Sequence, residues 1–392
     1  FHWTQQGEWK FDKTYWPDVA AMMEELGEMG VRLLVSIWPT VDPRSENYFE
    51  MRDQNMLIRA ERGPGALVYC RGPETYYDPT NPDARQFVWN KVKENYYSLG
   101  IQNFWLDEAE PEIGPYDYDN LRYWIGNGME VSSLYAKTFY DGQKEAGQDE
   151  ILNLIRCAFL GSQRFGVVLW SGDICSDFDS LRRQIKTGLH VAVSGIPWWT
   201  TDIGGFHGGD PDSEEYRECM IRWFQFGAFC PVFRMHGFRD KKDRPKSPPV
   251  TMDGVCYSGG PNEIWSYGKE AYSIMKHYVQ IRERLRPYIC RQFHLASQEG
   301  MPVMRPLFFD FPEEICYEIF DQYLFGSDIM VCPVYEKGKR ERRVYLPSNE
   351  IWIDTATGKE YVGGCLITAE APLERIPLFL RKGTKLNVEI FR

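Results

Sequence analysis

The chain has 392 residues, of which 45 are basic and 56 acidic, so its formal net charge is −11. Nucleic acids and anionic membranes bind clustered positive charge, and this balance argues against both as partners. The ten cysteines form no C-x-x-C pair and no Cys/His cluster with metal-ligand spacing, and no apolar stretch approaches the roughly 20 residues of a membrane span. We therefore expect free thiols in a cytoplasmic protein that uses no metal and no membrane anchor.

Over roughly the first 300 residues, strand-like apolar runs alternate with amphipathic, helix-like segments. Each of six strand-like runs is followed by a helix pattern, which indicates a parallel sheet. The expected strands are Val31–Trp38, Asn103–Leu106, Ile151–Ile155, Val167–Trp170, Ile196–Thr200 and Pro231–Arg234. The helix patterns include Pro17–Gly30, a helix capped by Asp177, and one long helix from Gly268 to Ser297.

Six such units fit either a doubly wound sheet or a (β/α)8 TIM barrel that lacks its first two strands. No G-x-G-x-x-G follows an early strand, which argues against the dinucleotide-binding form of the doubly wound sheet. A barrel without its first strands would expose unpaired edges. We therefore expect the natural protein to contain residues upstream of Phe1.

From about Met301 the pattern changes to short strands about ten residues apart, separated by hairpin signals such as Thr357-Gly358. This spacing predicts an antiparallel β-sandwich. The predicted domains are thus an N-terminally incomplete barrel, residues 1–300, and a C-terminal β-sandwich, residues 301–392. The expected strands lie at Met304–Phe309, Tyr323–Val334, Arg342–Leu346, Ile351–Tyr361, Cys365–Ala369 and Ile376–Leu380.

Two aspartates follow apolar runs in this barrel pattern. Asp107 ends Asn103-Phe104-Trp105-Leu106, and Asp173 follows Val167-Val168-Leu169-Trp170 after Ser171-Gly172. The carboxyl ends of parallel barrel strands converge at the mouth where barrel enzymes carry their catalytic residues. Two carboxylates beside aromatic side chains are the minimal equipment for cleaving a glycosidic bond. Alone, each aspartate is equally compatible with a cap or a turn.

The motifs around these aspartates resemble those of glycoside hydrolase family 31, the retaining α-glycosidases that include α-glucosidases and α-xylosidases. Trp105-Leu106-Asp107-Glu108-Ala109-Glu110-Pro111 is similar to the nucleophile segment of the family. Arg156, Gly161-Ser162-Gln163-Arg164 and Trp170-Ser171-Gly172-Asp173 are similar to its acid/base segment. Two further segments, Asp202-Ile203-Gly204-Gly205-Phe206 and Pro231-Val232-Phe233-Arg234-Met235-His236, match its sugar-binding regions in order and spacing.

The resemblance implies roles for these residues. Asp107 is the expected nucleophile and Asp173 the expected general acid/base, with their carboxyls about 5–5.5 Å apart as retaining chemistry requires. Arg156 is the candidate cation that keeps Asp107 ionised. Glu110 is an alternative acid, although we expect it to orient the nucleophile loop instead. No cofactor is implied.

The resemblance also suggests which side chains hold the sugar. Asp202 and His236 suit hydrogen bonds to hydroxyl groups, and Arg234 suits structural support of the carboxylates. Trp38 stands where glucosidases often have an acidic residue, so its ring favours xylose, which lacks the hydroxymethyl group. The expected substrate-binding residues are Trp38, Trp105, Arg156, Trp170, Asp202 and His236.

The sequence therefore predicts an exo-acting α-glycoside hydrolase for small α-linked oligosaccharides or glycosides. α-Xylosides are preferred, and α-glucosides and α-galactosides remain alternatives. Transglycosylation and lyase chemistry share the first, covalent half of this mechanism and stay open. A non-catalytic carbohydrate-binding barrel or an inactive fragment is the alternative of another class. Assembly into a homo-oligomer is possible, although no segment identifies an interface.

Overall fold

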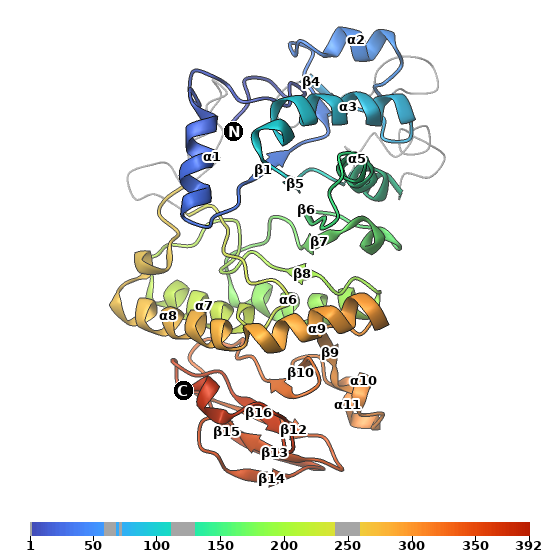
Figure 1. Cartoon of the computed structure of the whole chain (residues 1–392). Helices are drawn as coiled ribbons and strands as arrows, with labels where there is room; N and C mark the ends of the chain where they lie inside the picture. Colours follow the sequence, from blue (N-terminus) through green and yellow to red (C-terminus); the bar gives the residue numbers. More distant parts are fainter. Residues whose placement is uncertain (1, 59–67, 70–72, 111–129, 240–258) are drawn as a thin grey trace. The chain divides into compact units, whose positions relative to one another are not determined.

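The computed structural model describes residues 2–58, 68–69, 73–110, 130–239 and 259–392 (Figure 1). The chain divides into two compact units, Phe1–Leu169 and Trp170–Arg392, which we call the first and the second unit. Among the described residues, no helix is both long enough and apolar enough to cross a bilayer.

A parallel sheet lies at the centre of the first unit. Its strands follow the order β1-β5-β6-β7, and each neighbouring pair is parallel. The register pairs Ile37 with Leu106 and Leu106 with Ile155, so three strands end at one edge of the sheet. This confirms the predicted parallel sheet. The strands are β1 Leu34–Ile37, β5 Asn103–Leu106, β6 Asn153–Ile155 and β7 Val167–Trp170.

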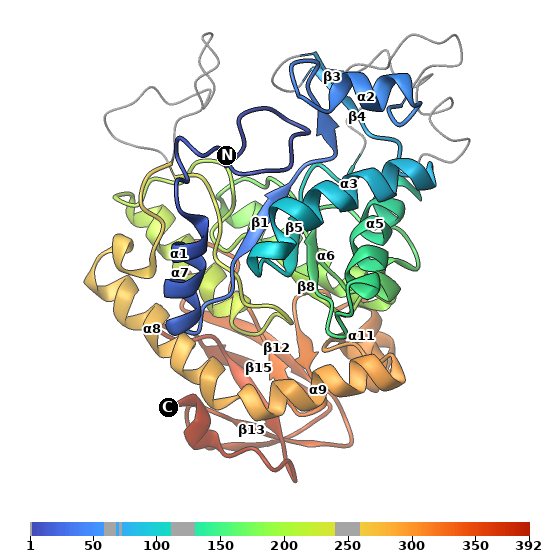
Figure 2. The same cartoon turned by 45° about the horizontal axis from the view of Figure 1, so that its top comes forward.

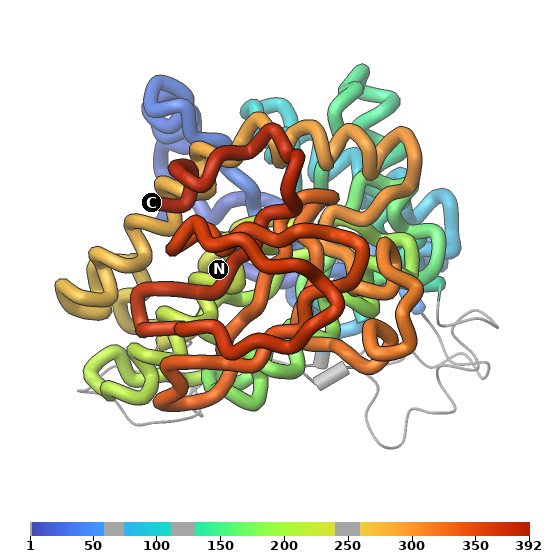
Figure 3. Tube along the Cα trace, turned by 90° about the horizontal axis from the view of Figure 1, so that it is seen from below, coloured from blue at the N-terminus to red at the C-terminus, as the bar shows by residue number. Residues whose placement is uncertain are grey.

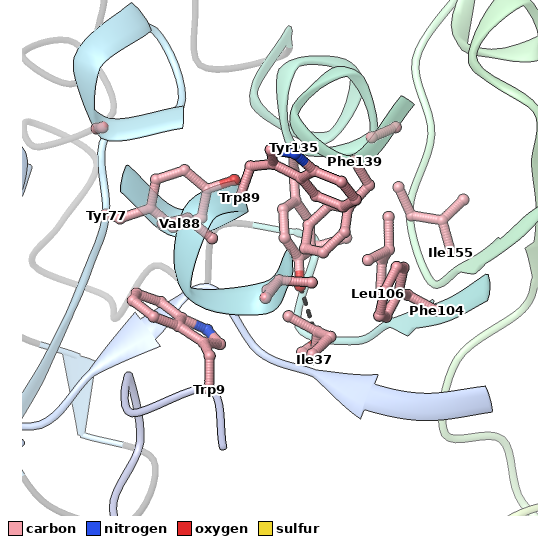
Figure 4. Packing of buried hydrophobic residues seen from close by; sticks show 14 of the residues in the cluster. Trp9, Ile37, Tyr77, Val88, Trp89, Phe104, Leu106, Tyr135, Phe139 and Ile155 are labelled. Atoms are coloured by element: carbon pink, nitrogen blue, oxygen red, sulfur yellow. Dashed lines mark hydrogen bonds between the residues drawn. The ribbon is translucent and has the colours of Figure 1, made fainter. Parts of the chain in front are cut away.

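Helices α3 and α5 cover this sheet, and aromatic side chains fill the space between them (Figures 2 and 4). Gly142 in α5 is required by this packing, because a Cβ atom there would lie 2.1 Å from the ring of Trp89. The hydroxyl of Tyr135 donates to the carbonyl of Ile37 at 2.7 Å, which fixes α5 against the end of β1. The helices of this unit are α1 Val19–Glu28, α2 Tyr48–Asp53, α3 Pro82–Asn95 and α5 Val131–Glu145.

The strand predicted for Val31–Trp38 is shorter than expected and is not buried on both faces. Only Leu34–Ile37 forms β1, and the side chain of Val31 is 48% exposed. Within the described residues β1 pairs with β5 alone, so it has the environment of an edge strand rather than of a central one. Trp38 itself follows the strand and is buried.

A small antiparallel sheet in the order β2-β4-β3 was not predicted from the sequence. The pairing places Thr40 opposite Tyr76, so the two side chains share a face. The Tyr76 hydroxyl donates to the carbonyl of Glu110 at 3.4 Å and so links this sheet to the segment after β5. Its strands are β2 Thr40–Val41, β3 Val68–Tyr69 and β4 Pro73–Tyr76.

In its described residues, the part of the second unit before Met301 contains the short strand β8 and four long helices. Asp177 accepts from the amide of Ser180 at 2.7 Å and caps α6, as predicted. The predicted helix from Gly268 to Ser297 is in fact two helices that meet at Leu285, because Pro287 lacks the amide hydrogen that a continuous helix needs. These elements are α6 Phe178–Val193, β8 Trp199–Thr200, α7 Glu214–Gly227, α8 Lys269–Arg284 and α9 Arg286–Glu299.

The strand predicted for Pro231–Arg234 does not form. Its nearest equivalent is a single bridge between Ile203 and Met235. Pro231 has no amide hydrogen to donate to a ladder, which favours an irregular path here. The predicted Met304–Phe309 strand is also too long, since the chain turns into the short helix α10 Leu307–Asp310 after Pro306.

The C-terminal part of the second unit consists of two antiparallel sheets, and Figure 3 follows its chain from orange to red. The larger sheet has the order β14-β13-β16-β11-β10-β9, and β12 pairs with β15. Side chains from both sheets, among them Trp352, Phe379 and Val344, form one core. The strands are β9 Met304–Pro306, β10 Tyr323–Phe325, β11 Ile329–Val331, β12 Glu341–Leu346, β13 Ile351–Asp354, β14 Glu360–Val362, β15 Cys365–Glu370 and β16 Leu378–Arg381.

Arg222 of α7 connects the helices of the second unit to these sheets through hydrogen bonds. Its guanidinium is buried and donates to the carbonyls of Lys339, Ala371, Pro372 and Arg375 over 2.7–3.1 Å. Burial lowers the pKa of Arg222 to about 10. Losing these bonds would remove the Arg222 donor from the carbonyls of Ala371 and Arg375, whereas Pro372 and Lys339 would keep a second donor.

Candidate active site

Asp107 stands where β5 ends. Its amide donates to the carbonyl of Ile37 at 2.9 Å, which continues the parallel hydrogen-bonding pattern one residue beyond the strand. The side chain is 19% exposed. The fold thus places a partly accessible carboxylate at the carboxyl edge of the sheet, as its position after an apolar run predicted.

Arg156 follows β6, the neighbour of β5, and reaches the same edge. Its Nη1 atom lies 3.5 Å from Asp107 Oδ1 and 3.1 Å from Glu108 Oε1. Its Nε atom lies 2.6 Å from Glu110 Oε1. One guanidinium therefore contacts three carboxylates, and Glu110 contributes to the order of the loop after β5 through this ion pair.

Glu108 has an unusual backbone conformation. Its φ of 48° falls in the left-handed region, and its side chain is nearly buried. The resulting turn brings the Glu108 amide to 3.0 Å from Asp107 Oδ1, to which it donates. Sequence reasoning noted the identity of this residue but did not find its conformation, because glutamate rarely adopts a positive φ.

Trp38 and Trp105 lie at the ends of neighbouring strands. Trp38 is buried, its carbonyl accepts from Trp9 Nε1 at 3.1 Å, and its ring lies 6.3 Å from that of Trp3. Trp105 is part of β5, directly before Leu106, and is half-buried. Trp38 and Trp105 thus lie close to the strand ends that carry the charged cluster.

Asp173 follows β7 after a turn at Gly172, whose φ of 72° favours glycine. The side chain of Asp173 is exposed. Trp170, the last residue of β7, is buried, and the guanidinium of Arg234 lies over its ring at 5.5 Å. Asp173 also contributes to the electrostatic environment of Asp202.

Asp202 is fully buried and pairs through Oδ1 with Arg234. Burial raises the pKa of this carboxyl, although the positive charge of Arg234 opposes the shift and Asp173 adds to it. Within the part of the chain that the structure describes, no group donates a hydrogen bond to Asp202 Oδ2. This oxygen is a buried acceptor, and such atoms are costly to leave unbonded.

The loop after Asp202 depends on its two glycines. A Cβ atom at Gly205 would lie 2.5 Å from the carbonyl oxygen of Cys175, and the φ of Gly205 is +80°. The following ring, Phe206, stacks on His236 with centroids 5.5 Å apart and planes at 28°. Burial, assisted by Arg234 and Arg239, lowers the pKa of His236 to about 3. His236 is therefore a neutral imidazole at physiological pH.

Arg239 is a residue that sequence reasoning missed. It is fully buried and donates to the carbonyls of Gly205 at 2.8 Å and Gly208 at 2.9 Å. Its Nε atom also donates to Tyr267 at 3.0 Å and to Asn262 at 3.1 Å. It fixes the loop that carries Asp202 and Phe206. No local pattern marked it, because its partners are distant in the sequence and mainly carbonyl groups.

Among the described residues, no group of three His, Cys, Asp or Glu side chains is arranged to hold a metal ion. The expectation that the protein uses no metal and no cofactor stays a prediction. The proposed distance between the Asp107 and Asp173 carboxyls also stays a prediction, because the two residues belong to different units.

Two family models match the chain. The model of the glycosyl hydrolases family 31 TIM-barrel domain matches residues 1–292, and that of the glycosyl hydrolase family 31 C-terminal domain matches residues 300–386. These matches confirm the predicted class of fold, a (β/α)8 barrel followed by a β-sheet domain.

Individual relatives agree with these matches. The crystal structure of an α-xylosidase from a soil metagenome, complexed with xylose, is 50% identical, with a TM-score of 0.93 over 99% of this chain and 58% of that chain. An α-xylosidase of Saccharolobus solfataricus is 35% identical over 98% of this chain and 50% of its own length. An uncharacterized family 31 glucosidase of Pseudescherichia vulneris is 51% identical over 62% of this chain and 46% of its own. The chain thus spans about half the length of the curated relatives it matches.

Proposed function

The chain belongs to glycoside hydrolase family 31, and on that premise we propose that it hydrolyses α-glycosidic bonds with retention of configuration, with α-xylosides as preferred substrates. One observation carries the proposal. The Asp107 carboxylate stands at the carboxyl edge of a parallel sheet, where an arginine and a backbone amide hold it in a defined orientation. A fixed, ionised carboxylate in that position suits attack on an anomeric carbon.

The proposed reaction has two steps. In the first, an Asp107 oxygen forms a bond to the anomeric carbon while the bond to the leaving oxygen breaks and Asp173 donates a proton to that oxygen. In the second, Asp173 takes a proton from water, whose oxygen attacks the anomeric carbon and releases Asp107. This mechanism requires the two carboxyls about 5–5.5 Å apart.

The proposed sugar contacts begin with Asp202 and His236. Asp202 Oδ2 is a buried acceptor to which no described group donates, which suits a hydrogen bond from a sugar hydroxyl. His236 is neutral and its ring orientation is fixed by Phe206, so it can donate to one hydroxyl and accept from another. The remaining proposed contacts are Arg156, Trp38, Trp105 and Trp170.

The preference for xylose rests on Trp38 and on the names of relatives. A buried ring at the end of β1 would occupy space that the hydroxymethyl group of glucose needs. The xylose-complexed structure and the S. solfataricus protein are both named α-xylosidases. α-Glucoside hydrolysis is the second candidate, because a relative of 51% identity is named a glucosidase.

Parallel assays of an aryl α-xyloside and the matching aryl α-glucoside test this proposal. We expect kcat/KM for the xyloside to be higher by about 10-fold or more, the range that one substituent of a sugar can supply. Asp107→Asn serves as the inactive control. Equal rates would contradict the preference for xylose, and no activity on either substrate would contradict the proposed hydrolysis of these α-glycosides.

A further inference from the structure

Glu108 combines an unfavourable backbone conformation with an ion pair, unlike a residue that only forms a turn. Four described residues other than glycine have a positive φ, and two of them, Asn55 and Asn349, are of a type that tolerates this conformation. Glu108 does not have this tolerance, and glycine would adopt the same backbone without strain. Backbone strain of this kind is retained where other interactions compensate for it. The ion pair between the Glu108 carboxylate and Arg156 therefore offsets the cost of the left-handed backbone.

That carboxylate shares a single nitrogen atom with Asp107. Arg156 Nη1 lies 3.1 Å from Glu108 Oε1 and 3.5 Å from Asp107 Oδ1, so the shorter contact goes to Glu108. The Glu108 side chain is 8% exposed, and at this depth charges interact more strongly than in water. Glu108 therefore draws the positive charge away from Asp107.

Asp107 needs its charge but not a tight ion pair. Arg156 and the Glu108 amide stabilise its ionised form. A closer Arg156 contact would stabilise the carboxylate further and so reduce its tendency to attack an anomeric carbon. The negative charge of Glu108 acts in the opposite direction, because a neighbouring like charge destabilises the ionised form.

We propose that Glu108 is a positioning residue that sets the reactivity of Asp107, holding Arg156 at an intermediate distance through its carboxylate and orienting Asp107 through its amide. This proposal rests on the proposed function of Asp107 as nucleophile. In the first unit the charged and titratable groups around Asp107 are Glu108 and Glu110 on its own loop, Arg156 from the end of β6, and Tyr135 from α5.

Three variants of the full-length protein separate the carboxylate from the backbone. Glu108→Gln removes the charge and keeps the side-chain length. Glu108→Asp keeps the charge. Glu108→Gly removes the carboxylate and relieves the left-handed backbone. Asn55→Gly is the matched control, since it relieves a similar backbone conformation outside this cluster. The readouts are kcat, the acidic limb of kcat/KM against pH, and Tm, with the preferred aryl glycoside as substrate.

For Glu108→Gln we expect kcat to fall on the order of 10-fold to 100-fold, as small displacements of a reacting group allow. The acidic limb should move to lower pH by about 1 unit, because the nucleophile loses a neighbouring negative charge. In Glu108→Asp the acidic limb should lie close to its wild-type position, because the negative charge is kept. Glu108→Gly should shift the limb as Glu108→Gln does, without a lower Tm.

An unchanged acidic limb of kcat/KM against pH in Glu108→Gln would overturn the proposal, whether kcat falls or not. A residue with only a structural role would change the rate or the stability without moving this limb. An acidic limb at its wild-type position in Glu108→Gly would also overturn it, because the backbone conformation alone would then explain the shift in Glu108→Gln. Wild-type turnover in Asp107→Asn would instead overturn the proposed function on which this inference rests.

Discussion

The charged cluster around Arg156 in the first unit and the one around Arg234 in the second unit differ in how they balance charge. In the first unit, three carboxylates contact one guanidinium, and the Asp107 side chain keeps 19% of its surface exposed. In the second unit, Arg234 pairs with the fully buried Asp202, and the fully buried Arg239 lies near enough to act on its pKa. The cluster around Arg156 is rich in negative charge and partly open, whereas the carboxylate of Asp202 is buried and paired with a cation.

The two clusters therefore suit different tasks. A carboxylate that must react needs a cation nearby but must stay accessible, and the cluster around Arg156 provides both. Groups that must recognise hydroxyls need fixed directions and few competing water molecules. Buried Asp202 and the neutral ring of His236 suit that task.

Among the variants that test this comparison, the largest effect on activity is expected for Asp173→Ala. Removing the proton donor should lower kcat/KM for substrates with poor leaving groups by about 10²-fold to 10⁴-fold. Substrates with activated aryl leaving groups need little protonation, so they should be much less affected. Asp179→Ala, an exposed aspartate of the following helix, is the control. A loss of equal size for all leaving groups would assign Asp173 to binding or folding instead.

A smaller effect on activity, with a clear effect on stability, is expected for Arg239→Met. The substitution removes the Arg239 donor from the Gly205 carbonyl and leaves the Gly208 carbonyl with only the longer bond from Ser176 Oγ at 3.3 Å. A buried carbonyl left without a donor costs about 1–3 kcal/mol of the free energy of unfolding. KM should rise because the loop with Asp202 loosens. Arg291→Met removes an exposed arginine that lies over a tyrosine ring and should change Tm little. Equal Tm changes in both variants would show that Arg239 does not hold the loop.

The smallest expected effect is the pH dependence that His236 adds to stability. Its pKa is about 3 when folded against 6.5 when unfolded, so between these values the unfolded chain binds a proton that the folded chain does not. Stability should therefore fall as the pH decreases through this window. Tm of His236→Gln should depend less on pH below 6.5 than that of the wild type, while exposed His294→Gln should follow the wild type. Parallel Tm curves for His236→Gln and the wild type would contradict the enclosed, neutral imidazole.

The sequence predicted those features that depend on local patterns. Apolar runs located β5 and β7, and the aspartates that follow them identified both candidate carboxylates. The class of fold and the family followed from the order of the motifs and are confirmed. Pro287 marks a helix break that its position should have revealed, because proline disfavours a continuous helix.

Features that depend on contacts between distant residues were not predicted. Arg239 binds carbonyl groups that no residue pattern identifies, and Glu108 has a left-handed conformation that its residue type does not favour. The small sheet β2-β4-β3 has strands too short to give a periodic signal. The assignment of every site residue, the boundary at residue 300, the cytoplasmic location and homo-oligomer formation stay predictions.

Azide rescue of Asp107→Ala tests most directly whether Asp107 is the nucleophile. The substitution should lower turnover of an activated aryl α-glycoside by roughly 10⁴-fold, the scale of losing a nucleophile. Azide should restore part of the rate by occupying the vacated space and attacking the anomeric carbon in a single displacement. The expected product is a glycosyl azide of inverted, β configuration, which NMR spectroscopy identifies. Undiminished turnover without azide, or an azide product of retained configuration, would contradict Asp107 as the nucleophile.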